Sequence, residues 1–443
     1  MSRRPKPHLV LVDAPPGPAL DHIVSSALPS LATCTVVTLR LGSAREQAQR
    51  AERLRALGPV TTVDRPDQVI DEILRITARG RPVDGVLALS ELVTYHAAVA
   101  AAALGLPANP PAAAARLRRK DLQRQALRDA GIACPSFAVV SDEPELRRAA
   151  ADLEFPVVLK PAVGIGSLCV TWAEDHDQLV AAFRRGVELY ARDPRVAGEL
   201  AVFVVESALR GWNWHGDDRM GTRVSVESLL VDGAVRHLAV TDKMPLVPPF
   251  REVGDVMPSG LPERRLGEIR EMTTDVLRAI GATSGATHTE LMLTASGPVV
   301  IEVNGRVGGG IVELMGTGFG YDVVRQLGRV ALGLHPDRLP EFDGHAFFYT
   351  PQPPRGEFEI LEIGGEAEIA GIPGVLEALR CKAPGDRLAD VQGTAYLFRI
   401  LAKSADFADF FAQLKAIEDA ITLELSPVGA AAARPTGSRV AVS

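Results

Sequence analysis

Cysteine is scarce in this sequence. Among 443 residues there are four, Cys34, Cys134, Cys169 and Cys381, scattered without a CxxC pair or a Cys/His cluster. Cysteines spaced in this way are typical of free thiols in a reducing compartment. We therefore expect a cytoplasmic protein.

An excess of positive charge and long hydrophobic runs are also missing. The 48 Lys and Arg residues are outnumbered by 55 Asp and Glu residues, a formal net charge of −7, which disfavours a nucleic-acid partner. No stretch approaches the length of a membrane span, and the apolar run at residues 8–12 is too short for a signal peptide. We expect neither nucleic acid nor membrane as a partner, and any bound anion must be held by local cations.

A dinucleotide fingerprint is absent as well. Residues 8–107 alternate short β-rich runs with helical ones, the pattern of a parallel α/β sheet. The first run, HLVLVD, is followed by APPGPAL and not by the GxGxxG motif that binds a dinucleotide pyrophosphate. A nicotinamide-dependent oxidoreductase therefore loses its main support.

The most informative segment that is present is HTELMLTASGPVVIEVNGRVGGG, residues 288–310. Its period-two alternation predicts a β-hairpin with Glu302, Asn304 and Arg306 on one face. Glu290 joins that face only if the loop around Ser296 and Gly297 has an odd length, or if a strand carries a bulge. We predict the odd loop. The residues expected on the opposite, apolar face are Leu291, Leu293, Val299, Ile301 and Val303.

The opposed carboxylates of this hairpin indicate a cation site. Glu290 and Glu302 would repel each other unless they were protonated or bridged by a cation. Oxygen ligands together with the amide of Asn304 favour Mg²⁺ over zinc or copper. The alternative is a solvated hairpin face with an incidental salt bridge.

A second segment suggests a phosphate site. FPVVLKPAVGIGSLCV, residues 155–170, predicts a strand ending in Lys160, a loop with Gly164, Gly166 and Ser167, and a return strand. Backbone N–H groups of such a loop approach phosphate oxygens closely while the lysine supplies a charge. A hairpin that uses glycine only for its turn is the alternative.

Other polar positions carry less information. Glu206 ends the apolar strand LAVFVVESAL, and Glu227 interrupts apolar neighbours in another strand, where a satisfied structural carboxylate is the commoner explanation. Cations are frequent on a predicted helix at about residues 112–130, and most of them are expected on a solvated face. They are Arg116, Arg118, Arg119, Lys120 and Arg124.

Taken in chain order, these features resemble the ATP-grasp superfamily over roughly residues 8–430. The series ESALRG, VSVESLLVDG, TDK, HTE and EVNGRVGGG is most similar to bacterial L-amino-acid ligases, which form dipeptides from unprotected amino acids, with carnosine-synthase-like enzymes as close cousins. The ordered set that carries the resemblance is Lys120, Lys160, Glu206, Glu290, Glu302, Asn304 and Arg306.

The resemblance implies a multidomain protein of mixed α/β and α+β class. We expect an N-terminal parallel α/β domain at 1–108 and an ATP-grasp domain at 109–334, with a small lid subdomain around 135–205. A small C-terminal α+β lobe is expected at 335–428. The small-residue-rich end, 429–443, is expected to be disordered.

The resemblance also implies a nucleotide site. Lys120 and Lys160 would neutralise ATP phosphates, with the glycine loop closing over them. Glu206 would edge the adenine pocket, above an apolar floor of Met292 and Val300. Where many relatives place a ribose-binding carboxylate, this chain has Trp212-Asn213-Trp214, so Asn213 is expected to be a weaker substitute.

Metal and substrate roles follow from the same resemblance. Glu290, Glu302 and Asn304 would hold two Mg²⁺ ions, which Mn²⁺ can replace. Arg306 would stabilise an acyl phosphate and the tetrahedral intermediate. The weaker expected substrate contacts are Glu227, Lys243, His288, Gly309 and Gly310. The glycines that follow Arg306 would enlarge one substrate pocket, or would instead allow a close backbone approach.

The implied activity is ATP-dependent ligation of two amino acids, or of an amino acid and a small amine, through an acyl phosphate with release of ADP and phosphate. Its partners would be small amino-acid substrates, and a homodimer is one candidate assembly. The alternative is another ATP-grasp ligase, of purine-pathway or biotin-carboxylase type, that acts on another carboxylate or on bicarbonate. A non-catalytic regulator is disfavoured because the Glu, Glu, Asn set is complete.

Overall fold

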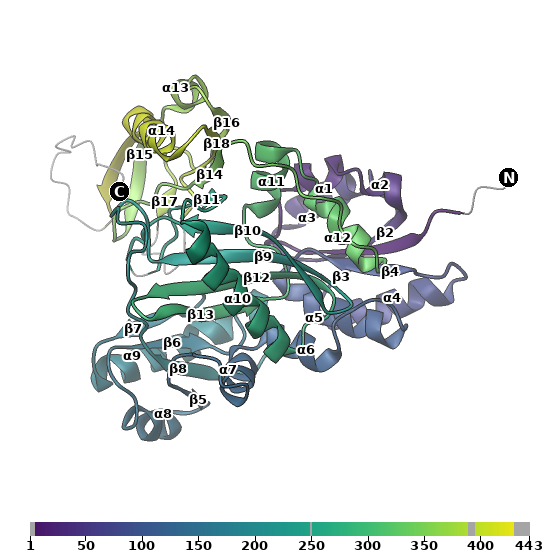
Figure 1. Cartoon of the computed structure of the whole chain (residues 1–443), viewed down its shortest axis with the longest axis horizontal. Helices are drawn as coiled ribbons and strands as arrows, with labels where there is room; N and C mark the ends of the chain where they lie inside the picture. Colours follow the sequence, from purple (N-terminus) through teal and green to yellow (C-terminus); the bar gives the residue numbers. More distant parts are fainter. Residues whose placement is uncertain (1–4, 249, 389–394, 429–443) are drawn as a thin grey trace.

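The computed structural model describes residues 5–248, 250–388 and 395–428, which form four β-sheets with helices packed on them (Figure 1). The expected disorder of 429–443 concerns residues outside this described part. Within it, no helix combines the length and the apolarity needed to cross a membrane.

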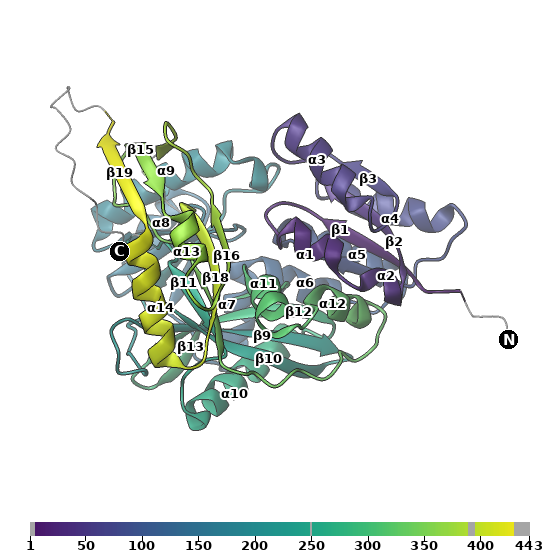
Figure 2. The same cartoon turned by 90° about the horizontal axis from the view of Figure 1, so that it is seen from above.

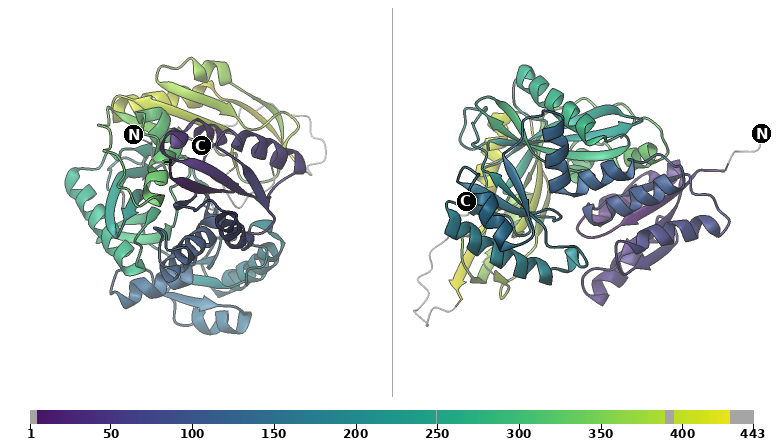
Figure 3. Two further views of the ribbon diagram at one scale, coloured as in Figure 1. Left: turned by 90° about the vertical axis from the view of Figure 1, so that its right-hand side faces the viewer. Right: turned by 90° about the horizontal axis from the view of Figure 1, so that it is seen from below.

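The N-terminal sheet is parallel, as the alternation of strands and helices predicts, with the order β3-β2-β1-β4. Leu9 and Leu11 of β1 belong to one hydrophobic core and Val10 and Val12 to another, so both faces of the sheet are covered. This sheet lies to one side of the molecule (Figure 3). Its elements are β1 (His8–Asp13), α1 (Leu20–Ser25), α2 (Leu28–Leu31), β2 (Thr33–Leu39), α3 (Ala44–Leu54), β3 (Val60–Val63), α4 (Gln68–Ala78), β4 (Gly85–Ala88) and α5 (Glu91–Ala103).

A second sheet contains the predicted glycine-loop segment. It is antiparallel, with the order β5-β8-β6-β7, and α8 and α9 pack on it. The strand that ends at Lys160 and the one that carries Glu206 are neighbours in this sheet. The elements of this part are α6 (Pro111–Arg118), α7 (Lys120–Asp129), β5 (Phe137–Val140), α8 (Glu143–Ala150), β6 (Val157–Pro161), β7 (Thr171–Ala173), α9 (His176–Arg192), the 3₁₀ turn η1 (Pro194–Val196) and β8 (Phe203–Ser207).

The largest sheet has eight antiparallel strands in the order β13-β12-β9-β10-β11-β14-β18-β16. It runs across the expected boundary at residues 334 and 335, because the strands after that point continue the sheet that contains the predicted hairpin. Helix α10 lies along this sheet (Figure 1). Its elements are β9 (Arg223–Val231), β10 (Ala234–Lys243), β11 (Gly254–Met257), α10 (Glu263–Ile280), β12 (Gly285–Thr294), β13 (Gly297–Asn304), α11 (Ile311–Phe319), α12 (Val323–Ala331), β14 (His345–Tyr349), β16 (Val375–Arg380) and β18 (Phe398–Ser404).

A small three-stranded sheet, in the order β17-β15-β19, completes the C-terminal part. The late helix expected from the sequence is α14, which begins after the capping side chain of Asp406 and lies along this end of the molecule (Figure 2). The remaining elements are β15 (Phe358–Gly364), α13 (Glu366–Ala370), β17 (Arg387–Leu388), α14 (Phe407–Ala420) and β19 (Thr422–Pro427).

The hairpin of β12 and β13 forms, but the predicted odd loop is wrong. Thr294 pairs with Gly297 across a two-residue turn. Opposite Glu290 and Leu291 of β12, a bulge in β13 shifts the register by one residue. The extra residue is Ile301 on β13, so Glu290 still pairs directly with Glu302. The bulge supplies the shift in register that we assigned to the loop.

The bulge also changes which apolar residues are buried. Val300, not Val299 or Ile301, joins Leu291, Leu293 and Val303 in the core beneath α10. Ile301 instead turns to the same side as Glu302. The assignment of Val299 and Ile301 to the buried face is therefore wrong, because strict alternation breaks at a bulge.

Truncating this core should destabilise the protein. We expect Leu291→Ala, at a position with 0% exposure, to lower the free energy of unfolding by about 2–5 kcal/mol. Val139→Ala, at a strand position with 45% exposure, should change it by less than about 0.5 kcal/mol. Denaturant unfolding of both variants measures the difference, and equal values would contradict the placement of Leu291.

Candidate active site

One cavity of about 740 Å³ collects most of the residues singled out in the sequence. Its walls come from the glycine-loop sheet, from α7, from the hairpin, and from strands β9, β10, β11, β14 and β18 of the large sheet. The loop after β1 also reaches it, at Pro16, Gly17 and Pro18. A cavity with this many separate walls depends on the packing of the whole chain.

Three charged side chains form a buried cluster at one end of the cavity. Glu206 lies 2.7 Å from Lys160 Nζ and 2.7 Å from Arg124 Nε, and Arg124 also donates to the carbonyl of Ile301 at 2.5 Å. Burial alone would raise the pKa of Glu206, but Arg124 and Lys160 together lower it. Burial lowers the pKa of Lys160. The cluster joins α7, β6, β8 and β13.

Arg124 was missed by the sequence analysis, which placed most cations of this helix on a solvated face. Its side chain is 1% exposed, whereas Arg128 of the same helix is exposed. The available signal was spacing, since Arg124 follows Lys120 by one helical turn and so shares its face. Buried Gln123 bonds the backbone N–H and carbonyl of Val303, which fixes α7 against the hairpin.

The predicted carboxylate pair lies in the middle of the cavity. Lys120 Nζ is 3.2 Å from Glu302 Oε2, and Arg223 Nη1 is 3.8 Å from Glu290 Oε2. Asn304, nearly buried at the end of β13, donates Nδ2 to Glu302 Oε1 at 3.0 Å. Burial works against ionisation of Glu302, but Lys120 leads the groups that lower its pKa. Both carboxylates are therefore held ionised side by side.

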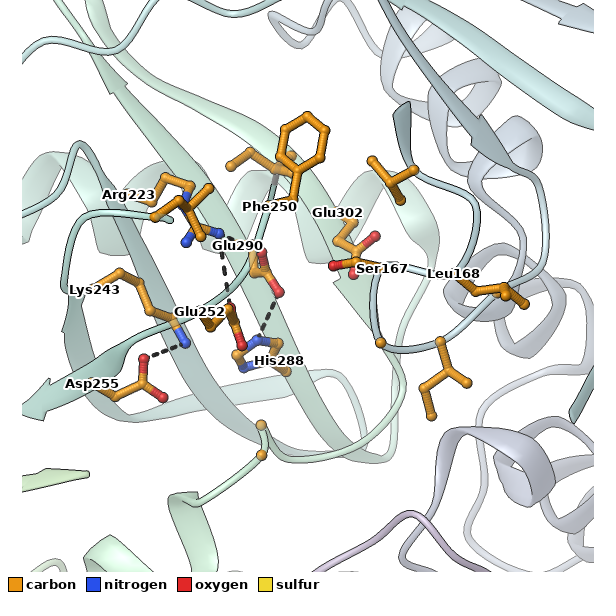
Figure 4. Close-up of a pocket in the computed structure, with 18 of the residues that line it drawn as sticks. Ser167, Leu168, Arg223, Lys243, Phe250, Glu252, Asp255, His288, Glu290 and Glu302 are labelled. Carbon is orange, nitrogen blue, oxygen red and sulfur yellow. Dashed lines mark hydrogen bonds and ion pairs between the residues drawn. The ribbon is translucent and has the colours of Figure 1, made fainter. Parts of the chain in front are cut away.

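His288 and Glu227 form a buried pair. Figure 4 shows His288 next to Glu290. Glu227 Oε1 is 2.5 Å from His288 Nδ1, its Oε2 accepts the N–H of Gly308 at 2.9 Å, and His288 Nε2 is 3.2 Å from Glu290 Oε1. Burial would lower the pKa of His288, but the two carboxylates raise it to about 9. His288 lines the cavity and Glu227, at 0% exposure, lies behind it, so a direct substrate contact from Glu227 gains no support.

The glycine loop forms another wall of the cavity. Gly164, Gly166 and Ser167 all line it, and Gly166 and Ser167 have positive φ angles of 62° and 56°. Lys120 Nζ donates to the carbonyl of Gly164 at 3.4 Å. The loop therefore lies directly over the lysine expected to bind phosphate.

Arg306 lines the cavity just after the hairpin. Its Nε lies 3.5 Å from Oε2 of Glu91, the first residue of helix α5, which packs on the N-terminal sheet. Burial raises the pKa of Glu91, an acid that the sequence analysis did not single out. Contact between Arg306 and a residue over 200 positions away follows only from the packed structure.

Two expected nucleotide contacts lie elsewhere. Asn213 bonds within its own loop, donating to the carbonyls of Asp217 and Met220, and it does not line the cavity. Val300 is buried in the core beneath α10, and Ile301 takes its expected place beside Met292 in the cavity wall. Asn213 is held in its own loop by these hydrogen bonds, and the bulge at Ile301 turns Val300 toward the core.

The other end of the cavity is more charged than the sequence suggested. Lys243 and Asp255 occupy paired positions on β10 and β11, and Lys243 Nζ lies 2.8 Å from Asp255 Oδ1. Burial alone would lower the pKa of Lys243, but the negative charge of Asp255 raises it. Arg223 lies near both Glu252 and Glu290, at 3.8 Å from each (Figure 4). Of these residues only Lys243 and Glu290 were expected.

Two family models match this chain. Residues 33–108 match the ATP-grasp N-terminal domain, and residues 153–314 match the ATP-grasp domain. The chain has the ATP-grasp fold. Both matched segments contribute to the cavity, the first through Leu89 and the second through the glycine loop and the hairpin. The ATP-grasp resemblance inferred from the sequence is thereby confirmed.

Among curated proteins, the chain is similar to alanine–anticapsin ligase of Bacillus subtilis (strain 168), 27% identical over 268 residues that cover 59% of this chain and 56% of that protein. It is 28% identical to carnosine synthase 1 of Homo sapiens over 299 residues, 63% of this chain and 34% of that protein. The chain thus spans about half the length, or less, of these relatives.

A solved structure agrees in fold over nearly the whole chain. The crystal structure of L-amino acid ligase from Bacillus licheniformis superposes with a TM-score of 0.76, covering 95% of this chain and 99% of that one, at 21% identity. This match extends the agreement in fold beyond both family models, through the strands that follow residue 335.

The ATP-grasp fold implies binding of ATP with Mg²⁺. The described residues contain no cluster of three His, Cys, Asp or Glu side chains that would hold a metal ion by themselves. Glu290 and Glu302 with the neighbouring amide of Asn304 nevertheless fit an ion that takes its remaining ligands from phosphate oxygens. The donor set suits a nucleotide-bound Mg²⁺ better than a resident metal.

The charge cluster at Glu206 should contribute measurably to stability. We expect Glu206→Gln to lower the free energy of unfolding by about 3–5 kcal/mol at pH 7, because it leaves Arg124 and Lys160 buried without their shared counter-charge. Glu143→Gln, which breaks a solvated ion pair with Arg184, is the matched control and should have a much smaller effect.

The loss should depend on pH. Since the pKa of Glu206 in the folded protein is lowered from 4.5, its ionisation stabilises the fold above that pH and ceases to do so as the pH falls through the lowered value. The difference between wild type and Glu206→Gln, measured by denaturant unfolding, should be constant near neutrality and shrink below pH 4.5. A difference that grew in acid would be inconsistent with this assignment.

Proposed function

We propose that this protein is an ATP-dependent carboxylate–amine ligase that joins two amino acids, with release of ADP and phosphate. The observation that carries the proposal is the composition of one cavity. Lys120 and Lys160 line it together with the glycine loop, the opposed carboxylates of Glu290 and Glu302 lie beside them, and a further charged wall contains Arg223, Lys243 and Asp255. The similarity to alanine–anticapsin ligase and carnosine synthase 1 supports this choice of substrates.

The nucleotide end provides local neutralisation of the triphosphate. Lys120 and Lys160 line the cavity on either side of the glycine loop, and each now contacts a carboxylate, Glu302 and Glu206 respectively. Bound phosphates would replace these carboxylates in part as the partners of the two lysines. Backbone N–H groups of the loop would donate further hydrogen bonds to the phosphates. Apolar Met292 and Ile301 would then face the base.

The metal would lie between the nucleotide and the substrate. Glu290, Glu302 and Asn304 would hold Mg²⁺, and Lys120 and Arg223 would move from the two carboxylates as it binds. When bound, Mg²⁺ lowers the charge repulsion between the triphosphate and an incoming carboxylate. His288, fixed by Glu227, would hold Glu290 in its orientation.

The reaction needs two substitutions. A carboxylate oxygen of the first amino acid attacks the γ-phosphorus, and the bond to ADP breaks, which gives an acyl phosphate. The neutral amine of the second amino acid then attacks the acyl carbon, phosphate leaves, and the amine loses a proton. Arg306 lines the cavity and is positioned by Glu91. It would stabilise the negative charge on the reacting oxygens in both steps.

An acyl phosphate must be protected from water. The glycine loop lines the cavity, and so do Pro16, Gly17 and Pro18 of the loop that follows β1. Closure of these segments on the substrates would exclude water during transfer. The cavity is therefore suited to an intermediate that must survive between two steps.

Another ATP-grasp ligase that acts on bicarbonate or on a non-amino-acid carboxylate shares the nucleotide end and differs beyond it. The alternation of Arg223, Glu252, Lys243 and Asp255 favours substrates that carry both an ammonium and a carboxylate group. A simple anion would leave the acids of this wall without a counterpart. The amino-acid ligase is accordingly the better supported function.

Removing one metal ligand tests the proposal directly. We expect Glu302→Gln to reduce ADP release with Mg²⁺, ATP and the active amino-acid pair by at least about a hundredfold, with unchanged circular dichroism. Glu362→Gln, at an exposed position of β15, should retain wild-type turnover. Screening single amino acids and then pairs, with mass spectrometry of products, names the substrates. Retained activity in Glu302→Gln would overturn the metal assignment.

The three glycines after Arg306 differ in the space around them. A Cβ at Gly308 would lie 2.6 Å from Nδ1 of His288, and Gly310 has a φ angle of 76°, whereas a Cβ at Gly309 would meet nothing within 4 Å. Gly308 therefore serves a close approach. Gly309 leaves open space in the cavity wall.

A larger residue at Gly309 should narrow substrate choice. We expect Gly309→Leu to lower kcat/KM for bulky amino acids by at least about tenfold and to spare small ones, because only the side-chain space is filled. Gly308→Ala should instead impair turnover with every pair, since it displaces His288. Steady-state kinetics over a size series of amino acids measures both, and a uniform loss in Gly309→Leu would contradict the assignment.

A further inference from the structure

The cavity contains more cations than the nucleotide and the acyl phosphate require. Seven Lys and Arg side chains line it: Lys120, Arg124, Lys160, Arg223, Lys243, Arg306 and Arg399. In the proposed function, the lysines of the glycine-loop end bind phosphates, Arg124 neutralises Glu206, and Arg306 stabilises the reacting groups. Arg223, Lys243 and Arg399 remain.

These three differ in how fully they are neutralised. Lys243 lies 2.8 Å from Asp255, and Arg223 lies between Glu252 and Glu290. Among the residues that the structure describes, Arg399, on β18, has one acidic neighbour, with its Nη2 3.5 Å from Oε1 of Glu313. That oxygen already accepts the N–H of Ala19 at 2.7 Å. The charge of Arg399 is thus the least matched of the three.

Arg399 is also held in a defined place. Its guanidinium lies over the ring of Phe348, 5.5 Å from the centroid, and its side chain is 33% exposed. Phe348 is paired with Asp255 on β11, and a Cβ on Gly310 would lie 3.5 Å from the Phe348 ring. Arg399 therefore lies on the same wall as the segment that follows Arg306.

The chemistry of ligation requires a cation in such a place. The carboxylate of the first amino acid is consumed when the acyl phosphate forms. The amine-donating amino acid keeps its α-carboxylate throughout. That anion enters a cavity whose walls include six acidic side chains, so it needs a donor with little competing charge. A guanidinium binds a carboxylate through two parallel N–H groups.

We propose that Arg399 binds the carboxylate that the amine-donating substrate retains. Glu313, buried beside it and bonded to the N-terminal segment, positions the guanidinium. Arg399 thereby selects an amino acid over a simple amine as the second substrate. This inference rests on the proposed function and adds to it which class of amine the site accepts.

The test separates the two half-reactions. Hydroxylamine traps an acyl phosphate as a hydroxamate, and it carries no carboxylate, so it needs the first amino acid, ATP and Mg²⁺ but not the subsite at Arg399. Peptide formation with the second amino acid needs the acyl phosphate and also the subsite at Arg399. The amide of that amino acid, which has no carboxylate, is the third acceptor.

We expect Arg399→Met to raise KM for the second amino acid by roughly tenfold to a hundredfold, the equivalent of a lost charge-assisted pair. Hydroxamate formation should be unchanged, and the preference for the free acid over its amide should disappear. Arg399→Lys should fall between wild type and Arg399→Met, because it keeps the charge and loses the planar fork.

Arg380→Met is the matched control. Arg380 lies on the neighbouring strand β16, has similar side-chain exposure and pairs with Glu366 at 2.9 Å, but it does not line the cavity. All three acceptors should react as in wild type. Unchanged peptide kinetics in Arg399→Met would overturn the inference, and so would an equal loss of hydroxamate and peptide, which would indicate a structural role. If wild type formed no hydroxamate with any amino acid, the proposed function would itself fail, and the inference with it.

Discussion

The site depends on the charge balance among side chains that are removed from water. Glu206 is shared by Arg124 and Lys160, and the two cations come from α7 and β6. Leaving any of these groups alone in the interior is costly, so the cluster is stable only when α7 and β6 stand at the right distance from β8. That requirement also places Lys120, one turn before Arg124, beside the carboxylate of Glu302.

From this cluster the polar contacts continue along the hairpin into the rest of the molecule. Glu290 bonds His288, His288 bonds Glu227, and Glu227 accepts the N–H of Gly308 in the segment that follows Arg306. Arg306 in turn approaches Glu91 of the N-terminal sheet. Each group orients the next, so the protein by itself holds these side chains in place.

The cavity also explains why the C-terminal part belongs to the site. Strands β14 and β18 continue the sheet that holds the hairpin of Glu290 and Glu302, so Phe348 and Arg399 face the same space as Lys243 and Asp255. In sequence, Phe348 and Arg399 stand more than a hundred positions from the glycine loop. The boundary expected at residue 335 follows the chain, whereas the hydrogen-bonded sheet extends beyond it.

The sequence by itself determined the ATP-grasp fold and the paired carboxylates, because these depend on local alternation, on glycine at a turn and on the order of a few polar residues. Tertiary structure alone decided the bulge at Ile301, the burial of Arg124 and Val300, the local role of Asn213 and the position of Arg399 at the cavity. The reason is physical. A bulge exchanges buried and exposed positions without any change in the sequence pattern that would reveal it. The pairing of distant charges is set by which elements pack together, and neighbouring residues in the chain do not encode that packing.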